Sequence, residues 1–187
     1  MRLGIFGGSF NPIHLGHLLL AETAREEFKL DRVVFIPAGQ PPHKPSRGLL
    51  SGLTRLKLIQ LAIRDAFAFV ASDIELRRSG PSYTIDTVKL LRQQAAEAEL
   101  WLLIGEDMLD VRWVQWNQLK RLCTIVVAHR GRKPSRPEKG LVWLTMPRLE
   151  ISSSNIRKRV ASGRSIRYLV PDAVGRYIRE HRLYVSA

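Results

Sequence analysis

Apolar and polar positions occur along the chain in blocks that predict strands followed by helices. The apolar runs are short, nearly continuous and often end at Gly or Pro, which is typical of strands buried on both faces of a parallel sheet. Between them, apolar residues recur with the spacing of amphipathic helices. Strands are predicted over 2–6, 32–38, 66–72 (with a short extension over 74–76), 100–105, 124–131, where a turn follows, and 141–146. Helices are predicted over 15–28, 53–66, 82–95, 114–122, 154–161 and 171–181.

This order of elements predicts an α/β fold, a doubly wound parallel sheet of the Rossmann-like type. The chain has 187 residues, a length that suits one domain with a sizeable core. No internal repeat or long linker divides it, so we expect a single domain over 1–187 whose C-terminal portion is helical from about residue 152. The segment 39–48, rich in Pro and Gly, is predicted to be a loop, and the polar, basic segment 131–140 is predicted to be a surface loop.

Composition adds one extreme value, a formal net charge of +13. Such a charge favours an anionic partner, and three classes fit: a polyphosphate substrate, a nucleic acid or a membrane surface. The charge alone does not distinguish among them. Cys123 is the one cysteine, so an internal disulfide is excluded, as is usual in a reducing cytosol. No apolar run reaches the roughly 18 residues of a membrane span, and no signal peptide is recognisable, so we expect a cytoplasmic protein without membrane contact.

The first stretch with chemical content is GGSFNPIHLGH, residues 7–17. Its glycines follow the first predicted strand, where they allow the backbone to approach a ligand and the loop N–H groups to face an anion. The stretch matches neither the dinucleotide fingerprint nor the P-loop. His14 and His17 stand three apart on one helix face, from which imidazoles can donate to charge that develops on a phosphate. The alternative is a helix cap with a chance pair of histidines.

A second stretch, ISSSNIRKR, covers residues 151–159. Ser152 or Ser154 is predicted to cap a helix, and Arg157 falls in the first turn. Free N–H groups, hydroxyls and a guanidinium at one helix start are able to hold a phosphate. By itself the stretch favours a plain serine cap with a solvated arginine, but together with the first stretch it favours a phosphate clamp.

The two stretches resemble the HxGH and ISSTxxR motifs with which the nucleotidylyltransferase superfamily binds ATP. Further segments resemble bacterial nicotinate-nucleotide adenylyltransferases and occur in the order of that family over nearly the whole chain. They are PAGQPPHK (37–44), PSYTIDTVKLL (81–91), LIGED (103–107), VVAHRG (126–131) and YLVPDAVGRYIREHRLY (168–184).

The resemblance implies transfer of AMP from ATP to nicotinate mononucleotide, which gives deamido-NAD and pyrophosphate and uses Mg²⁺. It implies no metal ligand in the chain itself, because Mg²⁺ is held through the ATP phosphates. The residues implied in catalysis are His14, His17 and Arg157. Those implied in ATP binding are Gly7, Gly8, Ser9, Phe10, His14, His17, Gly105, Asp107, Ser152, Ser154 and Arg157. Those implied at the nicotinate mononucleotide are Lys44, Tyr83, Thr84, Trp113, Trp116 and Arg130.

Four positions depart from the family pattern or leave a choice open. Trp113 and Trp116 flank the place of the tryptophan that stacks on the nicotinate ring, and the following NQL favours Trp113. Asn11 stands where aspartate is commoner, an accepted variant. Asp107, which the resemblance places on a ribose, is also a candidate N-cap of the next helix.

Other functions remain as alternatives to this interpretation. One is adenylyl transfer to nicotinamide mononucleotide or to pantetheine phosphate within the same superfamily. The other is a basic nucleic-acid-binding module around Arg157, Lys158, Arg159, Arg164 and Arg167, but no nucleic-acid-binding motif accompanies these residues. A helix start near Ser82, after Pro81, predicts preference for nicotinate over nicotinamide, because a helix N-terminus favours a carboxylate.

Overall fold

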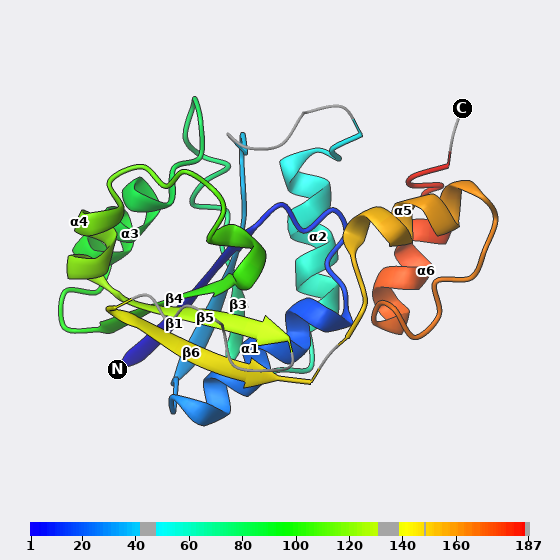
Figure 1. Ribbon diagram of the computed structural model, residues 1–187. Helices are drawn as coiled ribbons and strands as arrows, with labels where there is room; N and C mark the ends of the chain where they lie inside the picture. The colour runs from blue at the N-terminus through cyan, green and yellow to red at the C-terminus, as the bar shows by residue number, and fades with distance from the viewer. Residues whose placement is uncertain (42–47, 131–138, 148, 186–187) are drawn as a thin grey trace.

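The computed structural model of the chain describes residues 1–41, 48–130, 139–147 and 149–185. Within them six strands form one sheet in which all neighbours run parallel (Figure 1). The order across the sheet is β3-β2-β1-β4-β5-β6, which confirms the predicted doubly wound α/β fold. The switch in strand order lies between β1 and β4, where such folds bind ligands. The strands are β1 (Arg2–Gly8), β2 (Arg32–Pro37), β3 (Phe69–Ala71), β4 (Glu99–Gly105), β5 (Thr124–Arg130) and β6 (Leu141–Met146).

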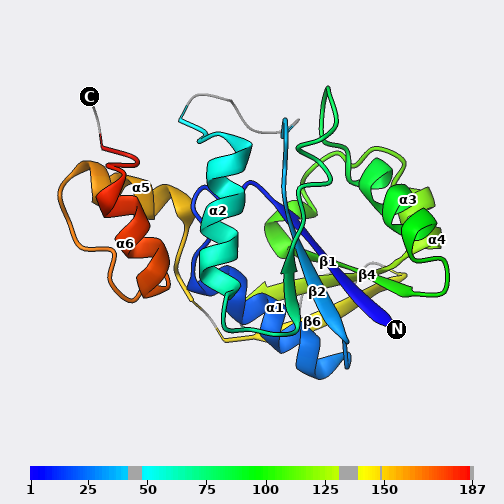
Figure 2. The same ribbon diagram turned by 180° about the vertical axis from the view of Figure 1, so that it is seen from behind.

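Helices cover both faces of the sheet (Figure 2). Strand β1 shows why, because Phe6 packs into one core cluster and its neighbour Ile5 into the other. The Phe6 cluster includes side chains of α1 (Leu15–Glu27), α2 (Gly52–Ile63), α5 (Ser153–Ala161) and α6 (Asp172–Glu180). The Ile5 cluster includes side chains of α3 (Thr84–Gln94) and α4 (Trp116–Leu122). No helix in the described ranges is both long enough and apolar enough to cross a membrane.

Helices α3 and α4 begin two residues later than the sequence pattern predicts. The side chain of Ser82 accepts hydrogen bonds from the backbone N–H groups of Gly39 (2.9 Å) and Gln40 (3.1 Å), so this residue anchors a neighbouring loop instead of starting α3. At α4 the backbone of Gln115 is left-handed, with φ of 55°, which excludes the residues before it from the helix.

Strand β3 is shorter than predicted, and the expected extension over 74–76 is wrong. Ala66 to Ala68 form a turn after α2, in which the N–H of Phe69 donates to the Ala66 carbonyl at 2.9 Å. The apolar side chain of Phe67 suggested a strand residue but is 96% exposed at this turn. After the strand, the N–H of Leu76 donates to the Asp73 carbonyl at 2.8 Å and closes a second turn.

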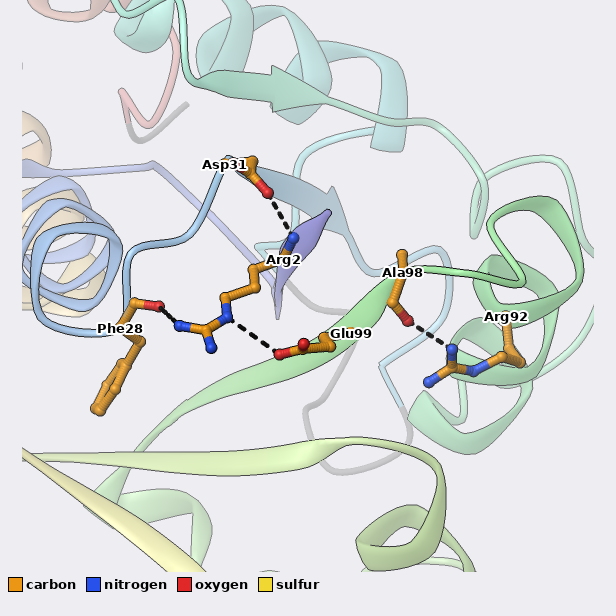
Figure 3. A network of polar contacts seen from close by, with 6 residues as sticks. All are labelled: Arg2, Phe28, Asp31, Arg92, Ala98 and Glu99. Atoms are coloured by element: carbon orange, nitrogen blue, oxygen red, sulfur yellow. Dashed lines mark hydrogen bonds and ion pairs between the residues drawn. The ribbon is translucent and has the colours of Figure 1, made fainter.

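Polar contacts join the strands at the amino end of the sheet (Figure 3). The backbone N–H of Arg2 donates to Asp31 at 2.6 Å, and its guanidinium contacts Glu99 at 3.1 Å and the Phe28 carbonyl at 3.2 Å. Arg92 donates to two carbonyls that precede β4 and β5, those of Ala98 and Leu122. These contacts fix the amino ends of the strands to one another. They lie at the edge of the sheet opposite to the carboxyl ends of the strands.

Candidate active site

A cleft of about 1300 Å³ opens at the carboxyl ends of the strands. Its walls come from the ends of β1 and β4, the starts of α1, α3 and α5, and the segment that follows β4. All of the predicted site residues whose side chains the structure describes, except Trp116, line this one cleft. They are Gly7, Gly8, Ser9, Phe10, His14, His17, Tyr83, Thr84, Gly105, Asp107, Trp113, Ser152, Ser154 and Arg157.

The glycine loop comprises residues 7–13, of which residues 7–11 line the cleft at the end of β1. The strand runs two residues further than expected, so Gly7 and Gly8 are its last residues. A Cβ atom at Gly7 would meet no protein atom within 4 Å, so the backbone here faces open space in which a ligand can approach closely. A Cβ at Gly8 would lie 3.1 Å from the ring of Phe10. Phe10 is only 2% exposed and packs edge-on against Phe6 and His17, at 5.4 and 5.0 Å between ring centroids. Its side chain therefore supports His17 from the core.

The two histidines stand at the start of α1 with their rings stacked, 3.6 Å apart and inclined by 21°. His14 is the N-cap residue, and its backbone N–H donates to Nδ1 of His17 at 3.2 Å. Since Nδ1 accepts, the neutral His17 ring carries its proton on Nε2, which remains a donor. Gly16 lets the rings sit this way, because a Cβ there would lie 3.2 Å from the His14 ring.

The serine-rich start of α5 meets the glycine loop directly. Arg157 donates to the carbonyl of Asn11 at 2.8 Å and to the hydroxyl of Ser154 at 3.2 Å. Ser152, rather than Ser154, caps the helix by accepting from the N–H of Asn155 at 3.1 Å. The hydroxyl of Ser153 donates to the Pro12 carbonyl at 2.8 Å. Two segments about 146 residues apart thus share one wall, as the two motifs together predicted.

The sequence interpretation missed Ser153, which joins α5 to the glycine loop. The signal was the run of three serines, of which only one can cap the helix.

Arg55 holds the glycine loop through hydrogen bonds to backbone carbonyls. The sequence interpretation did not identify this residue. Its side chain is 1% exposed and donates to the carbonyls of Ser9 (2.9 Å), Ala38 (2.7 Å) and Leu50 (2.9 Å). Burial lowers the pKa of this guanidinium, although Tyr184 and Glu75 oppose the shift. The sequence held a signal, because Arg55 lies three residues before Leu58 on the buried face of α2.

Asn11 connects the glycine loop with two further parts of the chain. Its side-chain NH₂ group donates to the Gly48 carbonyl at 2.8 Å. Its side-chain oxygen accepts from the Leu50 N–H at 3.3 Å and from the Tyr184 hydroxyl at 2.9 Å. The amide thus uses both of its polar atoms, and the residue is 5% exposed. A carboxylate here would have no proton to give to Gly48.

The other half of the cleft is formed by the start of α3 and the segment after β4. Tyr83 is the N-cap of α3, and Thr84 is its first residue. Trp113 lines the cleft and donates its indole N–H to the Met108 carbonyl at 2.8 Å, which fixes the ring. Trp116 lies outside the lining, at 5.3 Å from the Trp113 ring and 5.8 Å from the Lys120 ammonium. Of the two candidates, Trp113 is the one that lines the cleft.

A buried carboxylate, Glu75, lies beside α3 and lines the same half of the cleft. It is 6% exposed and accepts a hydrogen bond from the Thr87 hydroxyl at 2.7 Å. Burial raises the pKa of Glu75, while hydrogen bonds from Thr87 and Ser82 act in the opposite direction. The backbone of Glu75 lies so close to residue 39 that only glycine fits at that position. A Cβ at Gly39 would lie 2.6 Å from the Glu75 carbonyl oxygen.

Asp107 lies in a short 3₁₀ helix, η1 (Glu106–Met108), directly after β4. Its carboxylate folds back over Gly105, where a Cβ would come within 2.5 Å of the Asp107 oxygen. The N-cap of η1 is Gly105, so the alternative of Asp107 as a helix cap is wrong. The exposed carboxylate is free to face a hydroxyl-bearing ligand at the end of a parallel strand.

Two predicted positions cannot be placed in full. Lys44 lies outside the described residues, as does the side chain of Arg130, although the backbone of Arg130 ends β5. Within the described ranges, no group of three or more His, Cys, Asp or Glu side chains is arranged to hold a metal ion.

Comparison with known proteins gives a family match over most of the chain. A family model described as cytidylyltransferase-like matches residues 5–159. A probable nicotinate-nucleotide adenylyltransferase of Synechococcus sp. (strain JA-3-3Ab) is 44% identical over 201 residues, covering 99% of this chain and 95% of that protein. A probable nicotinate-nucleotide adenylyltransferase of Thermomicrobium roseum is 43% identical over 196 residues, covering 98% and 91%.

Solved structures show the same fold at lower identity. The nicotinic acid mononucleotide adenylyltransferase of Plasmodium falciparum, complexed with NaAD, gives a TM-score of 0.80 at 18% identity and covers 98% of this chain and 97% of its own. A putative nicotinate-nucleotide adenylyltransferase of Vibrio parahaemolyticus gives 0.75 at 20% identity, covering 100% and 98%. From the full-length identity to curated relatives, the chain belongs to the nicotinate-nucleotide adenylyltransferases, within the cytidylyltransferase-like family.

Proposed function

We propose that the protein transfers AMP from ATP to nicotinate mononucleotide and releases pyrophosphate. The observation that carries this function is the contact of Arg157 with the Asn11 carbonyl at 2.8 Å. It brings the serine-rich helix start against the glycine loop and the stacked histidines, so that donors converge on one cleft. The relatives of this chain carry the name of the same activity.

In the proposed reaction a phosphate oxygen of the mononucleotide attacks the α-phosphorus of ATP. A new P–O bond forms, the bond from the α-phosphorus to the oxygen bridging to the β-phosphate breaks, and that oxygen leaves with its electron pair as part of pyrophosphate. Reactions of this kind depend on positioning and on neutralising charge, and no protein nucleophile is needed. Cys123 has no role in this scheme, since burial raises the pKa of its thiol to about 12.

Each wall of the cleft has a proposed role. His17, with its proton on Nε2, donates to the charge that develops on the α-phosphate, and His14 orients the His17 ring by stacking and through its backbone N–H. Arg157 with Ser152 and Ser154 holds the β- and γ-phosphates and then the pyrophosphate. Asp107 accepts from a ribose hydroxyl of ATP.

We further propose that Mg²⁺ arrives bound to the ATP phosphates. The donors that line the phosphate half of the cleft are imidazole, hydroxyl, guanidinium and backbone N–H groups. Mg²⁺ prefers oxygen ligands and often takes them from substrate phosphates and water, which fits a site of this composition.

The start of α3 supports preference for nicotinate over nicotinamide. Thr84 is the first helical residue, so its backbone N–H faces outward without a helical acceptor, and the helix dipole adds partial positive charge. A carboxylate accepts a hydrogen bond from this N–H group. The NH₂ of an amide is itself a donor and cannot pair with the N–H. The ring of Trp113 lies in the same half of the cleft and provides a face for stacking.

The test is pyrophosphate release with MgATP and each of three acceptors: nicotinate mononucleotide, nicotinamide mononucleotide and pantetheine phosphate. We expect kcat/KM for the nicotinate compound to exceed that for the nicotinamide compound by roughly ten- to a hundredfold, because an unpaired buried donor costs about 1–3 kcal/mol. Equal values would contradict the role of the α3 N-terminus and leave adenylyl transfer standing. Turnover with pantetheine phosphate alone would contradict the proposed acceptor.

Nucleic acid and membrane surfaces are not among the proposed partners, and we propose a cytoplasmic location. The basic side chain of Arg157 is directed to the cleft wall by its bonds to Asn11 and Ser154. A salt-dependent shift of labelled RNA or DNA by the protein at physiological ionic strength would revive the nucleic-acid alternative.

A further inference from the structure

The end of the chain reaches the middle of the glycine loop. The hydroxyl of Tyr184 donates to the side-chain oxygen of Asn11 at 2.9 Å, across 173 positions of sequence. Tyr184 follows α6, which packs beside α2 (Figure 2). The backbone carbonyl of the same Asn11 accepts the guanidinium of Arg157 at 2.8 Å. A single residue therefore connects the C-terminal segment to the predicted phosphate clamp.

We propose that Tyr184 is a positioning residue for ATP, which holds Asn11 through its hydroxyl group and thereby sets the place of Arg157. The inference rests on the proposed function in so far as Arg157 binds the ATP phosphates. Tyr184 itself is not among the residues that line the cleft.

Asn11 is held firmly enough to transmit such an effect. Its side-chain NH₂ group is bonded to Gly48 and its oxygen accepts from both Leu50 and Tyr184. Loss of the Tyr184 bond leaves a buried oxygen with the longer of its two bonds alone, the 3.3 Å contact with Leu50. The amide, and the peptide carbonyl that receives Arg157, are then free to shift.

The hydroxyl of Tyr184 is a constant donor over the working pH range. Burial raises the pKa of Tyr184, and the positive charges of Arg157 and Arg55 oppose the rise only in part. The protonated form therefore persists at neutral and moderately alkaline pH, and the bond to Asn11 does not switch with pH there.

Backbone strain occurs on both sides of this contact. Phe10, directly before Asn11, has φ of 45°, and Tyr184 has φ of 63°. Bulky residues rarely adopt this left-handed region and keep it only where surrounding contacts enforce it. Six non-glycine residues of the described chain have this backbone conformation; of these, Tyr184 makes the contact with Asn11 and Phe10 directly precedes Asn11.

The experiment compares Tyr184→Phe with Tyr177→Phe. Both tyrosines are partly buried against the same core cluster, and Tyr177 stacks on His181 away from the cleft. Three quantities are measured for each variant: the Kd for ATP without acceptor, the KM for ATP, and the KM for nicotinate mononucleotide. We expect Tyr184→Phe to raise the Kd and KM for ATP roughly three- to tenfold, because a change of this size corresponds to the loss of one hydrogen bond. The KM for the mononucleotide, and all three values of Tyr177→Phe, should stay within about twofold.

A double variant separates positioning from general stability. In the Arg157→Ala background, Tyr184→Phe should change the Kd for ATP by less than about twofold, because its effect passes through Arg157. An unchanged Kd in Tyr184→Phe alone, an equal rise in both KM values, or the same rise with and without Arg157 would each overturn the inference. ATP binding by a wild-type protein that adenylylates no mononucleotide would instead contradict the proposed function and leave this test intact.

Discussion

The two edges of the sheet hold their arginines in different surroundings. At the amino edge, Arg2 pairs with Glu99 on the surface, where their side chains are 43% and 62% exposed (Figure 3). At the carboxyl edge, Arg55 is buried and bonded to three backbone carbonyls, and Arg157 joins a loop carbonyl to a serine. At the amino edge Arg2 also donates to the Phe28 carbonyl, and Arg92 donates to those of Ala98 and Leu122, so arginine bonds backbone at both edges. What differs is that the backbone held at the carboxyl edge, at Ser9, Asn11 and Ala38, lines the cleft.

The difference separates residues that hold the fold from residues that shape the site. An exposed ion pair contributes about 0–1 kcal/mol because water screens it and the side chains lose freedom. A buried donor that satisfies several carbonyls contributes more, since its loss leaves those carbonyls unpaired. Changes at the carboxyl edge should therefore affect ATP, the mononucleotide or both, and changes at the amino edge should affect neither.

The largest effect is expected for His17→Ala. Loss of the Nε2 donor should lower kcat by roughly a hundredfold or more, as for removal of one oxyanion-type donor, with a smaller change in the Kd for ATP. His181→Ala, which removes a histidine that stacks on Tyr177 outside the cleft, is the control and should leave kcat unchanged. Near wild-type kcat in His17→Ala would show that this imidazole does not act on the transition state.

Arg55→Met and Arg2→Met compare the two edges directly. Arg55→Met leaves the carbonyls of Ser9, Ala38 and Leu50 without their buried donor and should lower the free energy of unfolding by roughly 2–4 kcal/mol. Arg2→Met should lower it by less than about 1 kcal/mol. Urea titrations of both variants measure this, and similar losses would remove the distinction between the edges.

Arg157→Ala should act on one substrate. We expect the KM for ATP to rise roughly tenfold or more, the usual scale for a charge-assisted bond to phosphate, and the KM for the mononucleotide to stay nearly constant. Lys158→Ala is the matched control, because Lys158 is exposed on the next position of α5. A parallel rise in both KM values would indicate that Arg157 has only a structural role.

Trp113→Ala and Trp116→Ala distinguish the two candidate stacking residues. A stacked aromatic pair contributes about 0.5–1.5 kcal/mol to binding beyond the burial of its surface. Trp113→Ala should therefore raise the KM for nicotinate mononucleotide roughly three- to tenfold. Trp116→Ala should leave that KM within about twofold, since Trp116 lies outside the lining. The reverse order would place Trp116 on the ring.

Glu75→Gln gives the smallest expected effect, a change in pH dependence. The folded-state pKa of Glu75 is raised by burial, so the folded protein holds this proton more tightly than the unfolded chain. The wild type should therefore lose stability relative to Glu75→Gln as the pH rises above about 4.3, the usual pKa of an unfolded glutamate, through the folded value. Thermal melts of both proteins from pH 4 to 8 measure the difference, and a gap that is constant with pH would contradict this assignment.

Local sequence patterns were enough to predict the fold class and most of the strands and helices. The apolar runs predicted the strands because parallel strands bury both faces. The Gly-Gly at the end of β1 and the serines before Arg157 indicated the loop and the helix start that meet at the cleft. The sequence failed at Phe67, where an apolar residue lies in an exposed turn.

Local patterns could not show which distant residues the supports of the site contact. The contacts of Tyr184 with Asn11 and of Arg55 with Ser9 span 173 and 46 positions, and nothing in the spacing of residues encodes such pairs. Residue spacing likewise did not show that Trp113 lines the cleft while Trp116, whose ring lies 5.3 Å from the Trp113 ring, stays outside the lining.

Transfer of isotopic label tests the central claim most directly. The wild-type protein is incubated with nicotinate mononucleotide and MgATP that carries ³²P at either the α- or the γ-phosphate, and the products are separated. We predict that the α-label appears in the dinucleotide and the γ-label in pyrophosphate, because the bond that breaks lies between the α-phosphorus and the oxygen bridging to the β-phosphate. Appearance of the γ-label on the mononucleotide, or of the α-label only in ATP and its hydrolysis products, would contradict adenylyl transfer at this cleft.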